Sequence, residues 1–442
     1  MDLELSNINY IQRIQDAGIV GAGGAGFPTH VKLKATCETV IINGAECEPL
    51  LKVDQQLMEF YPKEVIEGLK IAMIQTGATK GAIGLKNKYK KAIKKLGDLL
   101  QNEPSIELHV VGDFYPAGDE QQLVYEITKK VVPLMGLPLD VGCVVINVAT
   151  AIHIAQNKPV TERIITVAGE VKIPQTFFAP IGTKFSDLIK ECDGPTDIEN
   201  YSIIVGGPMM GSVEEDWDAP VTKLTGGIII LPKNHMLIDK KTRKTTTDLK
   251  LTKAICCQCS YCTEMCPRYI IGKGTEPHKV MRGLANEDSN ALGVIGSVVS
   301  CCDCGLCTLY ACPMDLDPGK LTNMVKQSLL RKGAKTEKIV PYETDVLREY
   351  KKVPTKRLIA RLELSDYNVP APLNKEIFTT NFVQILLKQH IGVVASPTLS
   401  VGASVSKGTL IASCHDKLGA NIHSSINGKI TKITEKYIEI KA

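Results

Sequence analysis

Two copies of one cysteine pattern, about forty-five residues apart, constrain this chain more than any other feature of its sequence. The runs are Cys256-x2-Cys259-x2-Cys262-x3-Cys266-Pro267 and Cys301-x2-Cys304-x2-Cys307-x4-Cys312-Pro313. In such a run three closely spaced thiolates bind three irons of a cubane cluster, and the cysteine before proline binds the other cluster. Paired C-x2-C units also suit zinc, but zinc explains neither the third cysteine nor the repeated Cys-Pro step. The pattern therefore predicts two [4Fe-4S] clusters and a protein that transfers electrons.

The crossing of the fourth cysteine assigns the ligands of each predicted cluster. We expect the first cluster to be bound by Cys256, Cys259, Cys262 and Cys312, and the second by Cys266, Cys301, Cys304 and Cys307. Each run opens with a doubled cysteine, which leaves Cys257 and Cys302 over. Their use as ligands would shorten the first gap to one residue, so we expect both to be bystanders.

Composition limits the class of protein. A chain of 442 residues predicts about three domains, and its net charge of +4 is spread along the chain, which argues against a nucleic-acid partner. The Lys-rich stretch from Lys86 to Lys95 is typical of the solvated face of a helix. The sequence contains no apolar run of the ~18 residues that a membrane span needs, and no signal peptide. Together with 15 cysteines, this predicts the reducing cytoplasm and no disulfides.

Residues 1–160 alternate β-rich apolar runs with segments of helical periodicity. Runs at 39–42, 81–85, 106–111 and 143–148 are separated by helix-period segments around 63–75, 87–100 and 119–130. This alternation predicts a Rossmann-like α/β domain with a parallel sheet.

A glycine-dense loop, 21–26, precedes the first predicted strand. Such a loop lets backbone N–H groups surround a phosphate, although a glycine turn between packed elements is an almost equal alternative. Polar segments at 43–49, 115–120 and 147–150 follow three of the predicted strands. Since ligands gather at the carboxyl ends of parallel strands, these segments and the loop predict one convergent site.

These motifs resemble the flavoprotein subunit of respiratory complex I, in which the loop binds FMN and acidic residues help to seat NADH. By motif, the resemblance implies FMN contacts from Gly21, Gly23, Gly24, Gly26, Lys32, Asn43, Glu46, Tyr115, Gly118, Asn147 and Thr150. It implies NADH contacts from Phe27, Glu48 and Glu120. Hydride transfer would occur at FMN, so no catalytic side chain is predicted. Ala45 and Ile146 depart from the complex I pattern, and both departures bear on NADH rather than FMN.

Three further units follow. Residues 161–235 resemble the ubiquitin-like SLBB module, Lys240 to Thr247 are predicted to form an exposed linker, and 250–335 form a helical two-cluster ferredoxin-type domain. Short strands between glycine turns at 385–442 predict a β barrel-sandwich hybrid, as in lipoyl and biotinyl domains. Lys417 falls where a lipoyl lysine would lie, and the alternative, which we favour, is an unmodified hairpin lysine. The expected fold is thus multidomain, α/β plus α+β.

The order of these units resembles the RnfC component of the Rnf electron-transport complex, where, however, the barrel comes first. With the barrel last, the chain most resembles the PduS-type cobalamin reductases of propanediol-utilization microcompartments. That resemblance implies electron transfer from NADH through FMN and two [4Fe-4S] clusters to cobalamin or another corrinoid. It also implies a corrinoid adenosyltransferase and shell proteins as partners, and a place inside or at the shell. Two alternatives stay open: an RnfC-like relay component of a larger redox complex with a different acceptor, and a lipoyl-type carrier that uses Lys417.

Overall fold

A parallel four-stranded sheet forms the first part of the chain. The computed structural model describes residues 9–287, 295–334, 338–414 and 418–442. Its first sheet has the order β3-β2-β1-β5, with every neighbouring pair parallel. The strands are β1 (Thr39–Gly44), β2 (Lys80–Lys86), β3 (Ile106–Val111) and β5 (Cys143–Asn147). The predicted α/β domain is confirmed: β1, β2 and β5 are almost entirely buried, and only the edge strand β3 is partly exposed.

Seven helices accompany this sheet within the described residues. They are α1 (Tyr10–Asp16), α2 (Thr29–Lys32), α3 (Val53–Phe60), α4 (Pro62–Thr76), α5 (Lys90–Leu100), α6 (Glu120–Thr128) and α7 (Val148–Gln156). The prediction for Lys86 is wrong: it ends β2 rather than facing solvent on a helix, and its side chain is buried. Its Nζ lies 3.0 Å from Asp113 Oδ1 and 3.2 Å from Thr355 Oγ1, and these partners compensate the buried charge.

A six-stranded sheet of order β12-β7-β6-β10-β8-β9 forms the second part. Its strands are β6 (Glu162–Gly169), β7 (Gln175–Pro180), β8 (Tyr201–Val205), β9 (Ser212–Glu214), β10 (Gly227–Pro232) and β12 (Leu373–Ile377). The helix α8 (Phe185–Glu191) buries Phe185, Leu188 and Ile189 in the core of this part. The strand β12 arrives from almost 200 residues further along and pairs with β7, so the module is completed by a distant segment.

The segment predicted to be an exposed linker is helical. It contains the end of α9 (Met236–Thr242) and the start of α10 (Thr245–Ile255). Lys240 is only 4 % exposed, and its Nζ lies 2.7 Å from Asp315 Oδ1. The predicted exposure is wrong for Lys240, because its ion pair to the cluster part compensates the buried charge. Thr242, Lys244, Thr246 and Thr247 are exposed, as predicted.

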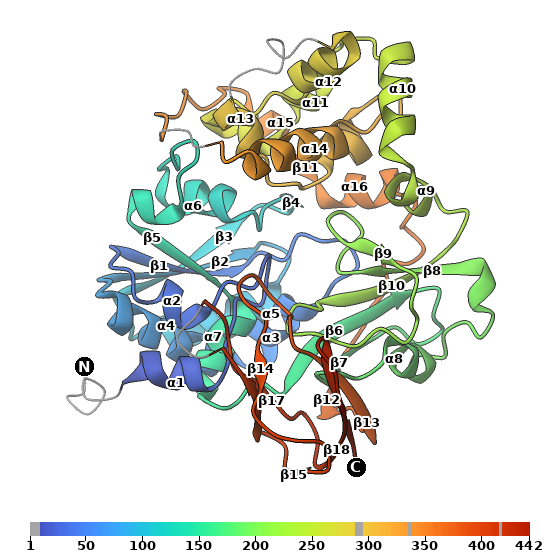
Figure 1. Cartoon of the computed structure of the whole chain (residues 1–442). Coiled ribbons are helices and arrows are strands. Elements are labelled where there is room, and N and C mark those ends of the chain that lie inside the picture. The colour runs from blue at the N-terminus through green and yellow to red at the C-terminus, as the bar shows by residue number, and fades with distance from the viewer. Residues whose placement is uncertain (1–8, 288–294, 335–337, 415–417) are drawn as a thin grey trace.

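The third part carries both cysteine runs, and it lies at the opposite end of the molecule from the C-terminal barrel (Figure 1). Its helices are α11 (Tyr261–Glu264), α12 (Pro277–Asn286), α13 (Ile295–Val299) and α14 (Pro318–Arg331), with π-helical turns at Tyr269–Lys273 and Cys307–Ala311. The chain then returns through α15 (Arg348–Lys351), β11 (Val353–Pro354) and α16 (Thr355–Arg361). The strand β11 pairs with β4 (Phe114–Tyr115) of the first part, which ties the two parts together.

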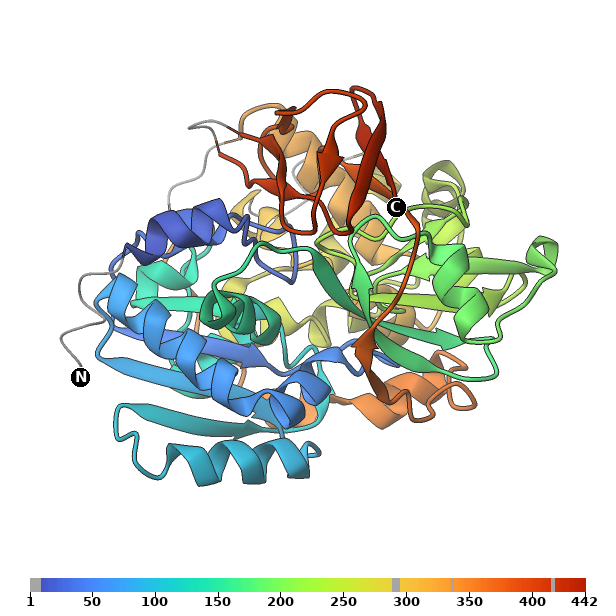
Figure 2. The same ribbon diagram turned by 90° about the horizontal axis from the view of Figure 1, so that it is seen from below.

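Two small antiparallel sheets make the C-terminal barrel, with orders β13-β19-β18-β15 and β14-β16-β17. The strands are β13 (Phe382–Leu386), β14 (Ser396–Pro397), β15 (Ser404–Val405), β16 (Leu410–Ser413), β17 (Ile422–His423), β18 (Gly428–Ile433) and β19 (Tyr437–Lys441). The barrel lies over the junction of the first and second parts (Figure 2). There the buried Lys223 Nζ donates to the carbonyls of Gly18 and Asn421, both at 2.6 Å.

Lys417, the predicted lipoyl position, lies outside the described residues. Among the helices that the structure describes, none has the length and apolarity to cross a membrane.

Candidate functional site

The glycine loop between α1 and α2 has the open surface that a phosphate group requires. A Cβ atom built on Gly23 or Gly24 would meet nothing within 4 Å, and Gly24 has φ +63°. The loop is held from behind: Ala22 N donates to Thr150 Oγ1 at 2.9 Å, and Arg163 donates to Ala22 O at 2.7 Å. Side chains at 23 and 24 would fill this space. Because both residues are glycine, the space stays open and the loop fits the phosphate group of FMN.

Two other glycines predicted to face FMN are required by packing. A Cβ on Gly26 would lie 2.7 Å from Leu224 Cδ2 and 2.8 Å from His390 Cβ. A Cβ on Gly118 would lie 2.4 Å from the carbonyl oxygen of Ala45. Gly26 therefore permits the loop to meet the second part and the barrel, and Gly118 permits two strand-end loops to touch.

The predicted polar residues at the strand ends are connected to one another. Asn43 Nδ2 donates to Gly118 O at 2.8 Å, and Asn147 Nδ2 donates to Asp54 Oδ2 at 3.0 Å. Lys32 Nζ donates to Val145 O at 2.6 Å and lies 3.3 Å from Glu120 Oε1. The structure thus brings a predicted FMN residue and a predicted NADH residue, Lys32 and Glu120, into one ion pair. Phe27, which is also predicted to contact NADH, directly follows the glycine loop and is 38 % exposed.

Two charged residues of this region were missed by motif reasoning. The Asp54 carboxyl is buried, and burial followed by the charge of Glu46 raises its pKa to about 8. Arg163 is also buried and donates to the carbonyls of Thr225 and Ala22. Burial raises the pKa of Glu46, which lies in the same electrostatic cluster. Asp54 lies in the first turn of α3, in a stretch (53–57) that carried the family resemblance without a site role, and Arg163 lies in a β-rich run, so the sequence assigned neither of them to the site.

Glu48 has partners that the prediction of an NADH contact did not anticipate. Its carboxylate accepts hydrogen bonds from the backbone N–H groups of Met209, at 2.8 Å, and Met210, at 2.9 Å. Burial raises the pKa of Glu48 to about 7. The structure therefore uses this carboxylate to attach the second part to the first, and its contact with NADH stays a prediction.

The predicted cluster cysteines gather around two separate cavities. Cys266, Cys301, Cys304 and Cys307, with the bystander Cys302, line a cavity of about 1210 Å³. Cys256, Cys259, Cys262 and Cys312, with the bystander Cys257, line a second and much smaller cavity. In each set the cysteine before proline comes from the other run, as the crossing pattern requires. Within the described residues, no three His, Cys, Asp or Glu side chains come close enough to hold a single metal ion.

The first part of the chain contacts the second cysteine set directly. Tyr115, whose contact with FMN stays a prediction, donates its hydroxyl to the backbone carbonyl of Cys304 at 2.7 Å. Beside it, Arg268 forms a buried ion pair with Asp119 at 2.6 Å. Gln122 Nε2 also donates to Pro267 O. Residues just after one predicted ligand, Cys266, are thus bound to the start of α6, so the predicted flavin and cluster sites share a wall.

Comparison with known proteins identifies relatives along the whole chain. The cobalamin reductase PduS of Citrobacter freundii is 40 % identical over 434 residues, which cover 97 % of this chain and 95 % of that protein. The corresponding protein of Salmonella typhimurium is 40 % identical over 445 residues, 100 % and 98 % of the two chains. The chain belongs to the PduS cobalamin reductase family.

The domain matches agree with this membership of the PduS family. Residues 14–156 match the Nuo51 FMN-binding domain, 164–213 the SLBB domain, 255–317 the 4Fe-4S dicluster domain and 371–442 the RnfC barrel sandwich hybrid domain. The predicted FMN and [4Fe-4S] cofactors are confirmed, and iron–sulfur clusters are favoured over zinc.

More distant relatives match only part of the chain or match it weakly. One component of the Na(+)-translocating ferredoxin:NAD(+) oxidoreductase complex of Acetobacterium woodii is 39 % identical over 268 residues, 58 % of this chain and 57 % of that one. Among solved structures, an NAD+-reducing [NiFe]-hydrogenase aligns at 18 % identity and a TM-score of 0.45, covering 81 % of this chain and 66 % of the other.

Proposed function

We propose that this protein transfers electrons from NADH through FMN and two [4Fe-4S] clusters to a corrinoid, as a cobalamin reductase. The observation that carries the proposal is the contact between Tyr115 and Cys304, because it joins an FMN-binding domain to a cluster cysteine. The full-length similarity to cobalamin reductases supports the acceptor.

We assign the flavin phosphate to the open backbone at Gly23 and Gly24, and the strand-end residues Asn43, Asn147 and Lys32 to the rest of the flavin site. When bound, FMN accepts a hydride as an electron pair and releases the electrons one at a time. Lys32 supplies a positive charge at the sheet edge, and Glu120 holds that ammonium in place. Thr150 fixes the loop through Ala22 N. The side chains of this site thus position and orient the flavin, and none of them is needed as an acid or base.

For the clusters we keep the two cysteine sets that surround the two cavities. The second set, with Cys304, is the one in contact with the flavin part, so we place it first on the electron path. The first set lies further away, and its Cys259 is exposed to solvent. We also propose that the reaction occurs beside a corrinoid adenosyltransferase in or at a microcompartment, which rests on the family resemblance.

The test is anaerobic purification followed by iron, sulfide and flavin analysis. NADH should then bleach the flavin and cluster absorbance and convert added hydroxocobalamin to its reduced forms in the absence of another protein. If the isolated chain contained both cofactors but NADH reduced neither of them, it would be a relay component that depends on a partner. If NADH reduced both but cobalamin stayed oxidised, the acceptor would be different.

A further inference from the structure

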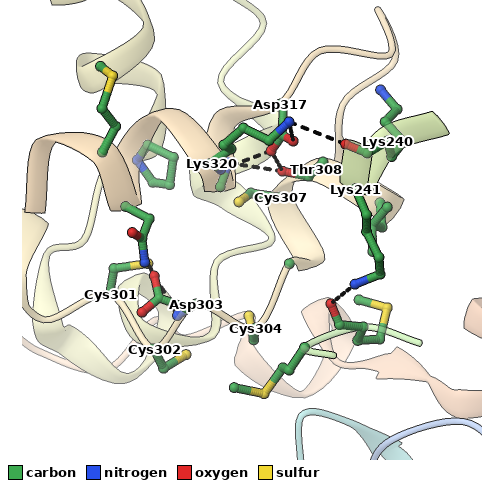
Figure 3. A pocket seen from close by; sticks show the side chains of 18 of the residues that line it. Lys240, Lys241, Cys301, Cys302, Asp303, Cys304, Cys307, Thr308, Asp317 and Lys320 are labelled. Atoms are coloured by element: carbon green, nitrogen blue, oxygen red, sulfur yellow. Dashed lines mark hydrogen bonds and ion pairs between the residues drawn. The ribbon is translucent and has the colours of Figure 1, made fainter. Parts of the chain in front are cut away.

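The cavity at the second cysteine set is larger than a [4Fe-4S] cluster requires. Its volume of about 1210 Å³ exceeds the roughly 300–1,000 Å³ of sites that hold drug-sized ligands. Cys301 and Cys302 lie at one side of the cavity, Lys240 and Lys241 lie at the other, and Cys304 and Cys307 lie between them (Figure 3). The remaining space is lined by residues 209–213 and Glu215 of the second part and by α14. Neither of these walls carries a predicted cluster ligand, so the cavity has room for a second ligand.

Hydrogen bonds with two charged side chains fix the backbone of the cavity wall at 209–211. Glu48 accepts the N–H groups of Met209 and Met210 from one side. From the other side, Lys241 Nζ donates to the carbonyls of Met209, at 3.1 Å, and Gly211, at 2.6 Å. Held by two charged groups, this backbone presents Met210, whose side chain is 54 % exposed although it is apolar. An exposed methionine on a fixed loop is typical of an adaptable apolar binding surface.

The wall at α14 is polar and then basic. Asn323, Gln327 and Ser328 line the cavity, followed by Arg331 and Lys332 at the end of the helix. Lys240, Lys241 and Lys320 also line the cavity, but each is held by hydrogen bonds within the protein. For Arg331 and Lys332, by contrast, the described part of the chain offers no ion pair or side-chain hydrogen bond. Two exposed cations therefore stand at the cavity without a side-chain partner among the residues that the structure describes.

We propose that this cavity binds the corrinoid acceptor beside the second cysteine set, an inference that rests on the proposed function. A corrinoid is a broad ring with apolar faces, a fringe of amide side chains and one phosphodiester in its nucleotide loop. Met210, which is exposed, suits a ring face, and the amides and hydroxyl of α14 suit the fringe. Arg331 and Lys332 suit the phosphodiester, because guanidinium and ammonium groups bind phosphate oxygens through charge-assisted hydrogen bonds.

The electron balance agrees with this position. NADH releases two electrons and one proton when it becomes NAD+, and a Co(III) corrinoid takes up two electrons, one at a time, to reach Co(I). The proton is released to solvent. This position revises the order of the electron path. The second cysteine set borders both Tyr115 and the cavity, so both electrons can leave there, and the first set stores one electron rather than standing between flavin and corrinoid.

The first experiment fills the cavity. Gln327→Trp places a large ring in it, and Leu330→Trp is the matched control because Leu330 is exposed on the same helix and does not line the cavity. Hydroxocobalamin binding is measured by ultrafiltration on protein whose iron, sulfide and FMN have been determined. We expect about tenfold or greater loss of affinity for Gln327→Trp, an unchanged value for the control, and unchanged cofactor contents for both.

The second experiment removes the cations. Arg331→Glu with Lys332→Glu is compared with Lys429→Glu and Lys441→Glu, which make the same charge change on exposed residues of the distant barrel. The first pair should weaken cobalamin binding about tenfold or more. The same pair should leave binding of cobinamide, which lacks the phosphodiester, unchanged. Arg331 and Lys332 are both exposed, so their replacement should not prevent folding. This double variant therefore tests the cavity assignment even if Gln327→Trp fails to fold.

The outcomes separate the two proposals. If the wild-type chain neither bound nor reduced cobalamin, the proposed acceptor would be wrong. If the wild-type chain bound and reduced cobalamin but both cavity variants bound it with wild-type affinity, the cavity assignment alone would be overturned.

Discussion

The hydroxyl of Tyr115 donates a 2.7 Å hydrogen bond to the backbone carbonyl of Cys304, a residue 189 positions further along the chain. Tyr115 is only 1 % exposed, and it lies on β4, the strand that pairs with β11 after the cluster part. One buried hydrogen bond thus links the FMN-binding domain to a predicted ligand of the second cluster. Removal of this hydrogen bond therefore tests how closely the FMN site and the second cluster depend on each other.

Tyr115→Phe should weaken the attachment of the two parts and retain both cofactors. The ring stays, but the buried carbonyl of Cys304 loses its donor, and an unsatisfied buried polar group costs about 1–3 kcal/mol. We expect a lower thermal midpoint with unchanged FMN and iron contents, and slower cluster reduction by NADH in stopped-flow absorbance. Tyr350→Phe, on a residue that is 88 % exposed, is the control. Equal stability of the two variants would mean that the hydrogen bond contributes nothing.

Gly24→Val should abolish FMN binding and leave cluster assembly intact. A β-branched side chain would fill the open loop and would strain a residue at φ +63°. Gly77→Val is a matched control, because Gly77 has φ +66° and equally open space but follows α4, outside the loop. Flavin analysis and dithionite reduction of the clusters measure the result. Stoichiometric FMN in Gly24→Val would move the flavin site elsewhere.

Cys304→Ser should remove one cluster only. We expect iron and sulfide to fall by about half, since each cubane has its own set of four cysteines. Cys257→Ser should leave the iron content unchanged, because Cys257 is exposed and is not an assigned ligand. Loss of all the iron from Cys304→Ser would indicate that the two clusters assemble as a unit, and no loss would indicate a wrong ligand assignment.

Asp54→Asn should make stability less sensitive to pH. In the folded chain, burial raises the pKa of Asp54 from 3.8 to about 8. Between these values the folded state retains a proton that the unfolded state has lost, so stability falls as pH rises through this window. Asparagine has no such proton. The free energy of unfolding of the variant, relative to that of wild type, should therefore be at least about 1 kcal/mol higher at pH 8 than at pH 5.5. A shift of one pKa unit corresponds to about 1.36 kcal/mol.

Thermal or denaturant unfolding at both pH values measures this difference. Asp98→Asn, at an exposed position of α5, is the control and should show no pH-dependent gain. A constant difference between wild type and Asp54→Asn at the two pH values would show that Asp54 ionises normally.

Periodicity correctly predicted strands whose burial can be recognised from a short apolar run of their own sequence. The apolar runs at 39–42 and 143–148 became neighbouring parallel strands, because a strand with two buried faces must be apolar throughout. Composition was misleading for the basic, threonine-rich stretch from Lys240 to Thr247, which is largely helical. Lys240 is buried there against Asp315, 75 residues away, and nothing near Lys240 in the sequence indicates that partner.

The same limit applies to the candidate site. The cysteine runs alone predicted which eight thiols belong to which set, since ligand spacing is a property of one short loop. The partner of Glu48 was not predictable, because a carboxylate in an acidic motif could bind a ligand or a backbone N–H group equally well. Only the folded chain shows that the N–H groups of Met209 and Met210 take both oxygens.

The sequence by itself determined the cofactor chemistry: thiolate spacing, glycine loops and strand patterns are local, and short segments specify them. The tertiary structure alone decided how these units meet, through the Tyr115–Cys304 hydrogen bond, the completion of the second sheet by β12 and the wide cavity beside the cysteines. These contacts join residues far apart in the chain. Each depends on complementary shape and charge from both partners, which neither segment encodes alone.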